Sequence, residues 1–175
     1  AVASFYSVAQ PGQATSLSVL QQVIAAASPD SGSVESAIAR LTAGVSGKVI
    51  DGYVQGALTF ADLNGDGLLN PGESSAVTDA SGNFSLPGIN GFGHLIASGG
   101  SDIATGKPSA GIMTAPAGST VINPLTTVAG KMMQAGFSST EAVARTLLPL
   151  GLDSHIDLLH FDPIQETLRT DTGAA

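Results

Sequence analysis

The chain has 175 residues, of which 43% are hydrophobic and 11% charged, with no cysteine and a net charge of −8. This composition suffices for one ordinary domain with a buried core, and it excludes a disordered, highly charged tail. The absence of cysteine excludes a disulfide framework and thiolate metal sites, and the scattered basic residues argue against a nucleic-acid partner.

Residues 1–46 are predicted to form a helical hairpin. Leu17, Leu20 and Ile24 lie on one apolar stripe, a Ser-Pro-Asp-Ser-Gly turn follows at 28–32, and a second helix begins near Ser33. Residues 37–40 (Ala-Ile-Ala-Arg) resemble residues 142–145 (Ala-Val-Ala-Arg). One interpretation therefore makes this hairpin the tail of a preceding unit in a tandem array, and the other leaves the likeness to chance.

Residues 47–122 change to a period of two, which is typical of strands. Turn sequences rich in Gly, Pro, Asn and Asp separate six short candidates, at residues 48–55, 57–62, 75–79, 83–86, 94–98 and 111–115. Strands of this length and spacing predict a small antiparallel β-sandwich.

Residues 123–175 return to a helical pattern. Asn123 is a good N-cap, Pro124 suits the first helical position, and the helix should end near Gly136. Ser138 and Glu141 have the spacing of a capping box for a second helix, and a last short helix is expected after Pro163. The predicted fold class is α+β, a small antiparallel β-sandwich with helical hairpins at both ends. Two long uncharged stretches are broken by Pro, Gly and Asn, so no membrane span is expected.

The strongest chemical motif is residues 62–73, Asp-Leu-Asn-Gly-Asp-Gly-Leu-Leu-Asn-Pro-Gly-Glu. Oxygen-bearing groups recur at loop positions 1, 3, 5, 7, 9 and 12, and Gly67 at position 6 allows the sharp bend that this spacing needs. The predicted metal ligands are Asp62, Asn64, Asp66, the Leu68 carbonyl, Asn70 and Glu73.

Calcium is the ion that this loop predicts. Ca²⁺ takes six to eight oxygen ligands at flexible angles, whereas zinc prefers Cys and His, which the loop lacks, and Mg²⁺ demands a stricter octahedron. The alternative is a polar surface turn without an ion. Because the flanking sequences read as strands, a paired helix–loop–helix sensor is not expected.

The sequence around this loop resembles a known module of very large bacterial surface and type I-secreted proteins. The resemblance rests on Gly-Ala-x-x-x-x-Asp-x-Asn-x-Asp-Gly at residues 56–67, on Thr-Asp-x-x-Gly-x-Phe at 78–84, and on residues 115–127. The first two segments are similar to the calcium-binding B-type repeats of staphylococcal surface proteins and to collagen-adhesin B-type modules. Residues 115–127 resemble a segment that follows such modules in large cyanobacterial and proteobacterial proteins. The likeness covers about residues 47–165.

The resemblance implies a prealbumin- or immunoglobulin-like sandwich that binds calcium and acts as a rigid stalk or adhesive module. Some collagen-adhesin relatives carry a Lys–Asn isopeptide bond beside a buried acid. Lys48 lies in the first predicted strand, but no matching acid stands in a core strand, so that bond is not expected.

Two further sets of polar residues are candidates for a functional role. His155 and His160, with Asp157 and Asp162 interleaved, can be a metal or acid–base group, or solvated residues of a loop-rich segment, which is the interpretation favoured here. Asp79 is expected to accept local backbone hydrogen bonds in a hairpin turn, with a further calcium contact as the alternative.

The sequence therefore predicts a non-catalytic, calcium-stabilised structural or adhesive module of a larger secreted bacterial protein, outside the cell or at its surface. The alternative is an accessory domain that positions substrate for a secreted enzyme. The expected partners are calcium, neighbouring modules of the same chain and a surface or polysaccharide ligand, with no nucleic acid.

Overall fold

The computed structural model describes residues 44–88, 93–109 and 111–166. The predicted helical hairpin of residues 1–46 lies outside these ranges except for its last three residues. The strands are β1 (Val45–Val49), β2 (Val54–Gln55), β3 (Leu58–Asp62), β4 (Ser75–Val77), β5 (Asn83–Leu86), β6 (His94–Ser98), β7 (Ser101–Asp102), β8 (Ile112–Ala115) and β9 (Val121–Ile122). They are followed by α3 (Pro124–Gln134), α4 (Ser139–Leu147) and the 3₁₀ turn η2 (Leu148–Leu150).

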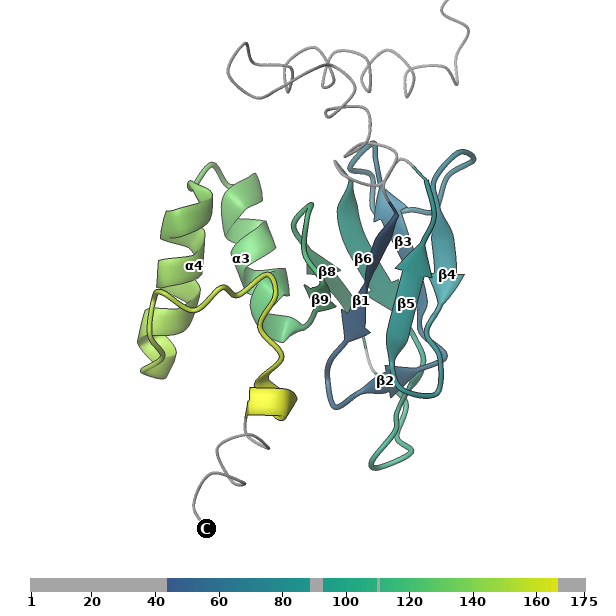
Figure 1. Cartoon of the computed structure of the whole chain (residues 1–175). Helices are drawn as coiled ribbons and strands as arrows, with labels where there is room; N and C mark the ends of the chain where they lie inside the picture. The colour runs from purple at the N-terminus through teal and green to yellow at the C-terminus, as the bar shows by residue number, and fades with distance from the viewer. Residues whose placement is uncertain (1–43, 89–92, 110, 167–175) are drawn as a thin grey trace, which may run out of the picture.

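Two sheets enclose one hydrophobic core. A three-stranded sheet has the order β5-β1-β9, and a four-stranded sheet has the order β4-β3-β6-β8, with a small β2-β7 pair at one end (Figure 1). The core draws on both sheets, with Val49, Leu86 and Ile122 from the first and Ala61 and Leu95 from the second. Burial alternates as predicted along β5, where Phe84 and Leu86 are buried while Asn83 and Ser85 are exposed, whereas β3 and β6 are buried at consecutive positions. The mixed α and β structure is compatible with a β-sandwich.

Two strand predictions were wrong. The expected strand over residues 48–55 is divided, because the chain turns at Asp51 and Gly52, whose φ is 67°, and Ile50 bridges back to Tyr53. The sheets are also not wholly antiparallel, since β9 pairs parallel with β1 through Lys48–Val121 and Val49–Ile122. A two-residue strand carries too little alternation for its partner to be predicted.

The predicted C-terminal helices are confirmed, and α3 and α4 lie side by side (Figure 1). Asn123 caps α3 by accepting from the Thr126 amide at 2.8 Å, and the Thr126 side chain completes the capping box. The same end of α3 protects the edge of the four-stranded sheet. The Thr127 hydroxyl accepts from the Thr114 amide, and the Thr126 hydroxyl donates to the Thr114 carbonyl.

The segment after α4 returns to the three-stranded sheet. The Thr120 amide donates to the Leu159 carbonyl at 2.9 Å, and the Tyr53 hydroxyl donates to Asp162 at 3.0 Å. Lys48 lies over the Tyr53 ring, 4.1 Å from its centre. Burial, followed by the hydrogen bond to Asp162, raises the pKa of Tyr53. No local pattern in the sequence predicts this contact, which joins residues 109 positions apart.

We expect Tyr53→Phe to lower the free energy of unfolding by about 1 kcal/mol, the typical value of one partly buried hydrogen bond. Because the folded pKa of Tyr53 is raised, the contribution of this bond is complete below pH about 10 and is lost as the pH rises through the folded value. Urea unfolding at neutral and at strongly alkaline pH checks both statements. A difference between the two proteins that persists undiminished in alkali would contradict the assignment to the hydroxyl group.

Candidate metal site

The predicted calcium loop connects two strands, as expected. Its first residue, Asp62, ends β3, and β4 begins at Ser75, two residues after Glu73. Within the four-stranded sheet, β3 and β4 are antiparallel neighbours, and the Ala61 amide donates to the Ser74 carbonyl at 3.1 Å. The loop therefore begins and ends on adjacent, hydrogen-bonded strands, which holds its two ends close together.

Asp62 organises the first half of the loop. Its side chain is buried, with 4% exposed, and its two oxygens accept from the backbone amides of Gly65 at 2.7 Å and Gly67 at 2.8 Å. Gly67 has a φ of 77°, the left-handed conformation predicted for loop position 6. Each carboxylate oxygen has a second lone pair, so Asp62 retains acceptor capacity after making both bonds.

Asn64 and Asp66 continue the same pattern. The Asn64 side-chain oxygen accepts from the Asp66 amide at 3.1 Å, and Asp66 Oδ1 accepts from the Leu68 amide at 2.8 Å. In each of these Asx turns, a side-chain oxygen accepts a hydrogen bond from the backbone amide two residues ahead. Successive turns of this kind coil the chain. The hydrogen bonds from Leu68 and then Asn70 lower the pKa of Asp66, so this carboxyl is ionised at neutral pH.

Four of the predicted ligands meet in space. The Asn70 side-chain amide donates to Asp66 Oδ2 at 2.8 Å and to the Leu68 carbonyl at 3.0 Å, and the Asn64 amide donates to the same Asp66 oxygen at 3.0 Å. An amide NH₂ group between two acceptor oxygens has the position that a cation attracted by both would take. Rotation of either Asn amide by half a turn directs its oxygen there instead.

Glu73 closes the second half of the loop. Its two oxygens accept from the backbone amides of Leu63 and Asn70, each at 2.8 Å, so the carboxylate spans the loop from position 2 to position 9. Like Asp62, it binds the main chain through both oxygens and keeps spare lone pairs. The next residue, Ser74, donates to the Pro87 carbonyl and so joins the loop to the end of β5.

The donor set fits calcium in its chemistry. It contains three carboxylates, two amides and one carbonyl, all hard oxygen donors. Within the described ranges, no group of three or more His, Cys, Asp or Glu side chains is gathered closely enough to hold a metal ion. Both oxygens of Asp62 and of Glu73 accept from backbone amides of the loop. Asp66 is therefore the one carboxylate among the four ligands that meet in space. Mutual repulsion opposes the gathering of three carboxylates unless a cation lies between them.

His155 and His160 belong to two separate exposed pairs. His155 bonds to Asp153 at 2.8 Å, and His160 bonds to Asp157 at 2.9 Å. Asp162, which the sequence placed beside them, bonds to Tyr53 instead. The His155 side chain is 91% exposed and that of His160 is 49% exposed. The two histidines thus have different carboxylate partners, which agrees with the solvated interpretation.

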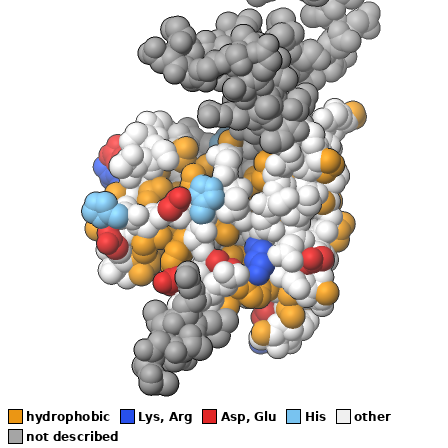
Figure 2. Space-filling view, viewed as in Figure 1, with side chains coloured by type: hydrophobic (Ala, Val, Ile, Leu, Met, Phe, Trp, Pro, Cys, Tyr) orange, Lys and Arg blue, Asp and Glu red, His pale blue; other side chains and the backbone are white. Residues whose placement is uncertain are grey.

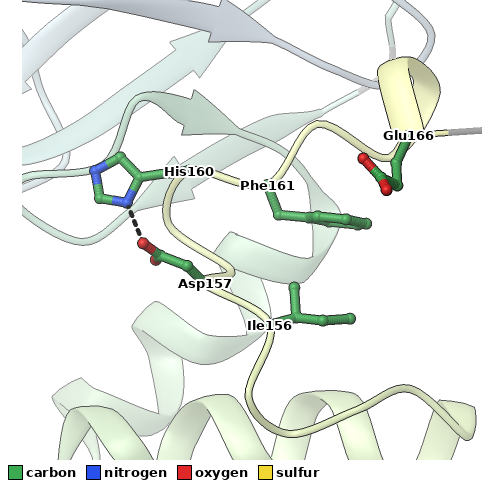
Figure 3. A pocket seen from close by; sticks show the side chains of 5 residues that line it. All are labelled: Ile156, Asp157, His160, Phe161 and Glu166. Carbon is green, nitrogen blue, oxygen red and sulfur yellow. Dashed lines mark hydrogen bonds and ion pairs between the residues drawn. The ribbon is translucent and has the colours of Figure 1, made fainter. Parts of the chain in front are cut away.

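An open hollow of about 470 Å³ lies beside His160 (Figure 3). Ile156 and Phe161 line it with apolar surface, while Asp157 and Glu166 place carboxylates at its rim. On the face drawn in Figure 2, charged side chains are spread among hydrophobic and uncharged ones, and some of them lie beside a side chain of the opposite type. The hollow beside His160 is open to solvent rather than enclosed.

Asp79 has the local role predicted for it. One oxygen accepts from the Ser81 and Asn83 amides, both at 2.8 Å, and the other accepts from the Asn83 side chain at 2.9 Å. The Asn83 side-chain bond first, then the backbone bonds, lower the pKa of Asp79, and the charge of Lys48 contributes. The predicted absence of an isopeptide bond stays a prediction, and Lys48 stacks on Tyr53.

No family model, no curated protein and no solved structure matches this chain. In the part of the chain that is described, no helix has the length and apolar character needed to cross a bilayer. The likeness to bacterial B-type modules therefore rests on the sequence motifs alone.

Proposed function

We propose that this chain is a calcium-stabilised, non-catalytic structural module of a longer secreted bacterial surface protein. The main support for the proposal is the hydrogen-bonded coil of residues 62–73, which connects two paired strands. An ion bound by Asp62, Asn64, Asp66, the Leu68 carbonyl, Asn70 and Glu73 would link the end of β3 to the start of β4. Such a link stabilises a segment that has few apolar contacts of its own.

Three features support a structural role. The start of the described part at β1 and its end at residues 163–166 lie toward opposite ends of the molecule (Figure 1), which suits a unit placed in series with others. The two sheets around one core are also compatible with the prealbumin- or immunoglobulin-like sandwich that the sequence resemblance implies. The exposure of both His–Asp pairs favours the same role over catalysis.

Calorimetric titration of the fully chelated protein tests the proposal. We expect Ca²⁺ to bind with a dissociation constant between about 10⁻⁷ M and the millimolar range of extracellular modules, and more tightly than Mg²⁺ or Zn²⁺. Asp62→Ala and Glu73→Gln should abolish binding, because each removes a charged ligand.

Asp153→Ala is the matched control. Asp153 also accepts a local backbone amide, that of His155 at 2.9 Å, but it lies outside the loop. The variant should bind calcium as the parent chain does. Absence of calcium binding by the parent chain, or equal binding by all four proteins, is incompatible with the proposed site.

A further inference from the structure

Asn64 is followed by Gly65, and this dipeptide has a chemistry of its own. With no side chain on the following residue, the Gly65 backbone nitrogen can attack Asn64 Cγ. The attack forms a five-membered succinimide, and the side-chain nitrogen leaves as ammonia, which carries away the proton that the Gly65 amide loses. Water then opens the ring to aspartate or isoaspartate, so that the net change is water in and ammonia out. Asn64 is solvent-exposed, so water reaches it freely.

The folded loop restrains both reacting groups. The Gly65 amide donates to Asp62 Oδ1 at 2.7 Å, and this bond must break before the nitrogen can lose its proton and attack. The Asn64 side chain is held by Asp66, whose amide donates to its oxygen at 3.1 Å and whose Oδ2 accepts from its nitrogen at 3.0 Å. Ring closure turns this side chain back toward Gly65 and breaks both contacts.

The other described asparagines lack this reactivity. Asn70 and Asn123 precede prolines, whose nitrogen carries no proton, and Asn83 precedes Phe84, which is buried on β5. Within the described ranges, Asn64 is therefore the asparagine whose following residue permits rapid ring closure. The hydrogen bonds around Asn64 then determine the rate of that reaction.

We propose that Asn64 is a self-modification site, and that the Asp62–Gly65 and Asn64–Asp66 hydrogen bonds set its rate by keeping the loop closed. Each product changes the loop in a definite way. Aspartate adds a fourth carboxylate, at loop position 3. Isoaspartate adds one methylene to the main chain and displaces Asp66 from its spacing relative to Asp62. Only the effect on calcium rests on the proposed function, because the reaction itself needs no ion.

The test follows conversion of Asn64 by peptide mass spectrometry, with the full chain in mildly alkaline buffer under a chelator. Asp62→Ala should convert about tenfold faster than the parent chain, as expected for the loss of a hydrogen bond to a charged acceptor. Asp66→Ala should also accelerate conversion, because it frees the Asn64 side chain. This variant replaces Asp62→Ala as the test if the loss of the buried Asp62 carboxylate prevents folding. Asp79→Ala, which removes an acceptor of two backbone amides in another turn, should leave the rate unchanged.

Urea-unfolded samples of all four proteins should convert at one common rate, faster than the folded parent chain. The proposal is overturned if the folded parent converts as fast as the unfolded one, or if neither loop variant converts faster than Asp79→Ala. Calcium should slow conversion in the parent chain. A further outcome is that calorimetry detects no calcium binding while Asn64 still converts faster in the loop variants. That outcome would contradict the proposed calcium site and support the proposed modification site.

Discussion

Chelation of calcium should lower the melting temperature of this protein by roughly 5–10 °C. An ion that binds only the folded state adds RT ln(1 + [Ca]/Kd) to the free energy of unfolding, about 2.7 kcal/mol at a hundredfold excess over Kd. The same treatment should expose residues 64–70 to protease, because this segment is largely solvent-exposed and held by local hydrogen bonds. Differential scanning calorimetry and limited proteolysis, each with and without chelator, measure the two effects.

Variants separate the ion from other effects of the chelator. Asp62→Ala and Glu73→Gln should melt at the same temperature with and without calcium. His155→Ala should keep the full calcium dependence, because that side chain is exposed and bonded to Asp153. A melting curve that chelation does not move, in a parent protein shown to be free of metal, would mean that the loop is rigid without calcium.

Gly47→Ala should lower the free energy of unfolding by about 3 kcal/mol, the upper end of the usual cost of overpacking. A Cβ atom at this position would lie 2.1 Å from the Thr120 carbonyl oxygen and 2.9 Å from the end of the Phe84 ring. The oxygen belongs to the backbone just before β9, and the Lys48 amide donates to it at 2.9 Å. The added methyl group must therefore displace the parallel β1–β9 pair or break this bond.

Ser46→Ala is the matched control for Gly47→Ala. Ser46 neighbours Gly47 on β1 and is exposed, and its hydroxyl bonds only to the exposed Ser85 hydroxyl at 3.0 Å. Its loss should change stability by at most about 0.5 kcal/mol. Urea unfolding compares the two variants, and equal midpoints for both would show that β9 does not pack against Gly47 as described.

Local signals allowed much of the fold to be predicted. The strands β5 and β6 have the predicted bounds, because turn residues lie at both ends of each, and burial alternates along β5. The α3 helix begins at Pro124 because Asn123 and Pro124 give an N-cap and a first helical residue. The flanking strands of the calcium loop were predicted for the same reason, from apolar and β-branched residues at period two.

Long-range contacts escaped prediction. The parallel β1–β9 pair, the Tyr53–Asp162 bond and the Thr114 edge contacts each join segments whose own sequences give no sign of their partner. The division of the first expected strand depended on Gly52, which was read as a strand residue and instead adopts a positive φ. In the loop, the spacing of the ligands could be predicted from the sequence. The hydrogen bonds that Asp62 and Glu73 accept from backbone amides could not, because they depend on how the loop folds in three dimensions.

Anomalous X-ray diffraction from crystals grown with calcium tests the central claim most directly. We expect one strong anomalous peak inside the loop, about 2.3–2.6 Å from oxygens of Asp62, Asn64, Asp66, Leu68 and Glu73, with Asn70 bound directly or through water. The Asn70 amide should then no longer donate to Asp66, because its place between the oxygens is taken by the ion. Absence of a peak at saturating calcium, with the hydrogen bonds of residues 62–73 unchanged, would mean that the loop is a polar turn and not a calcium site.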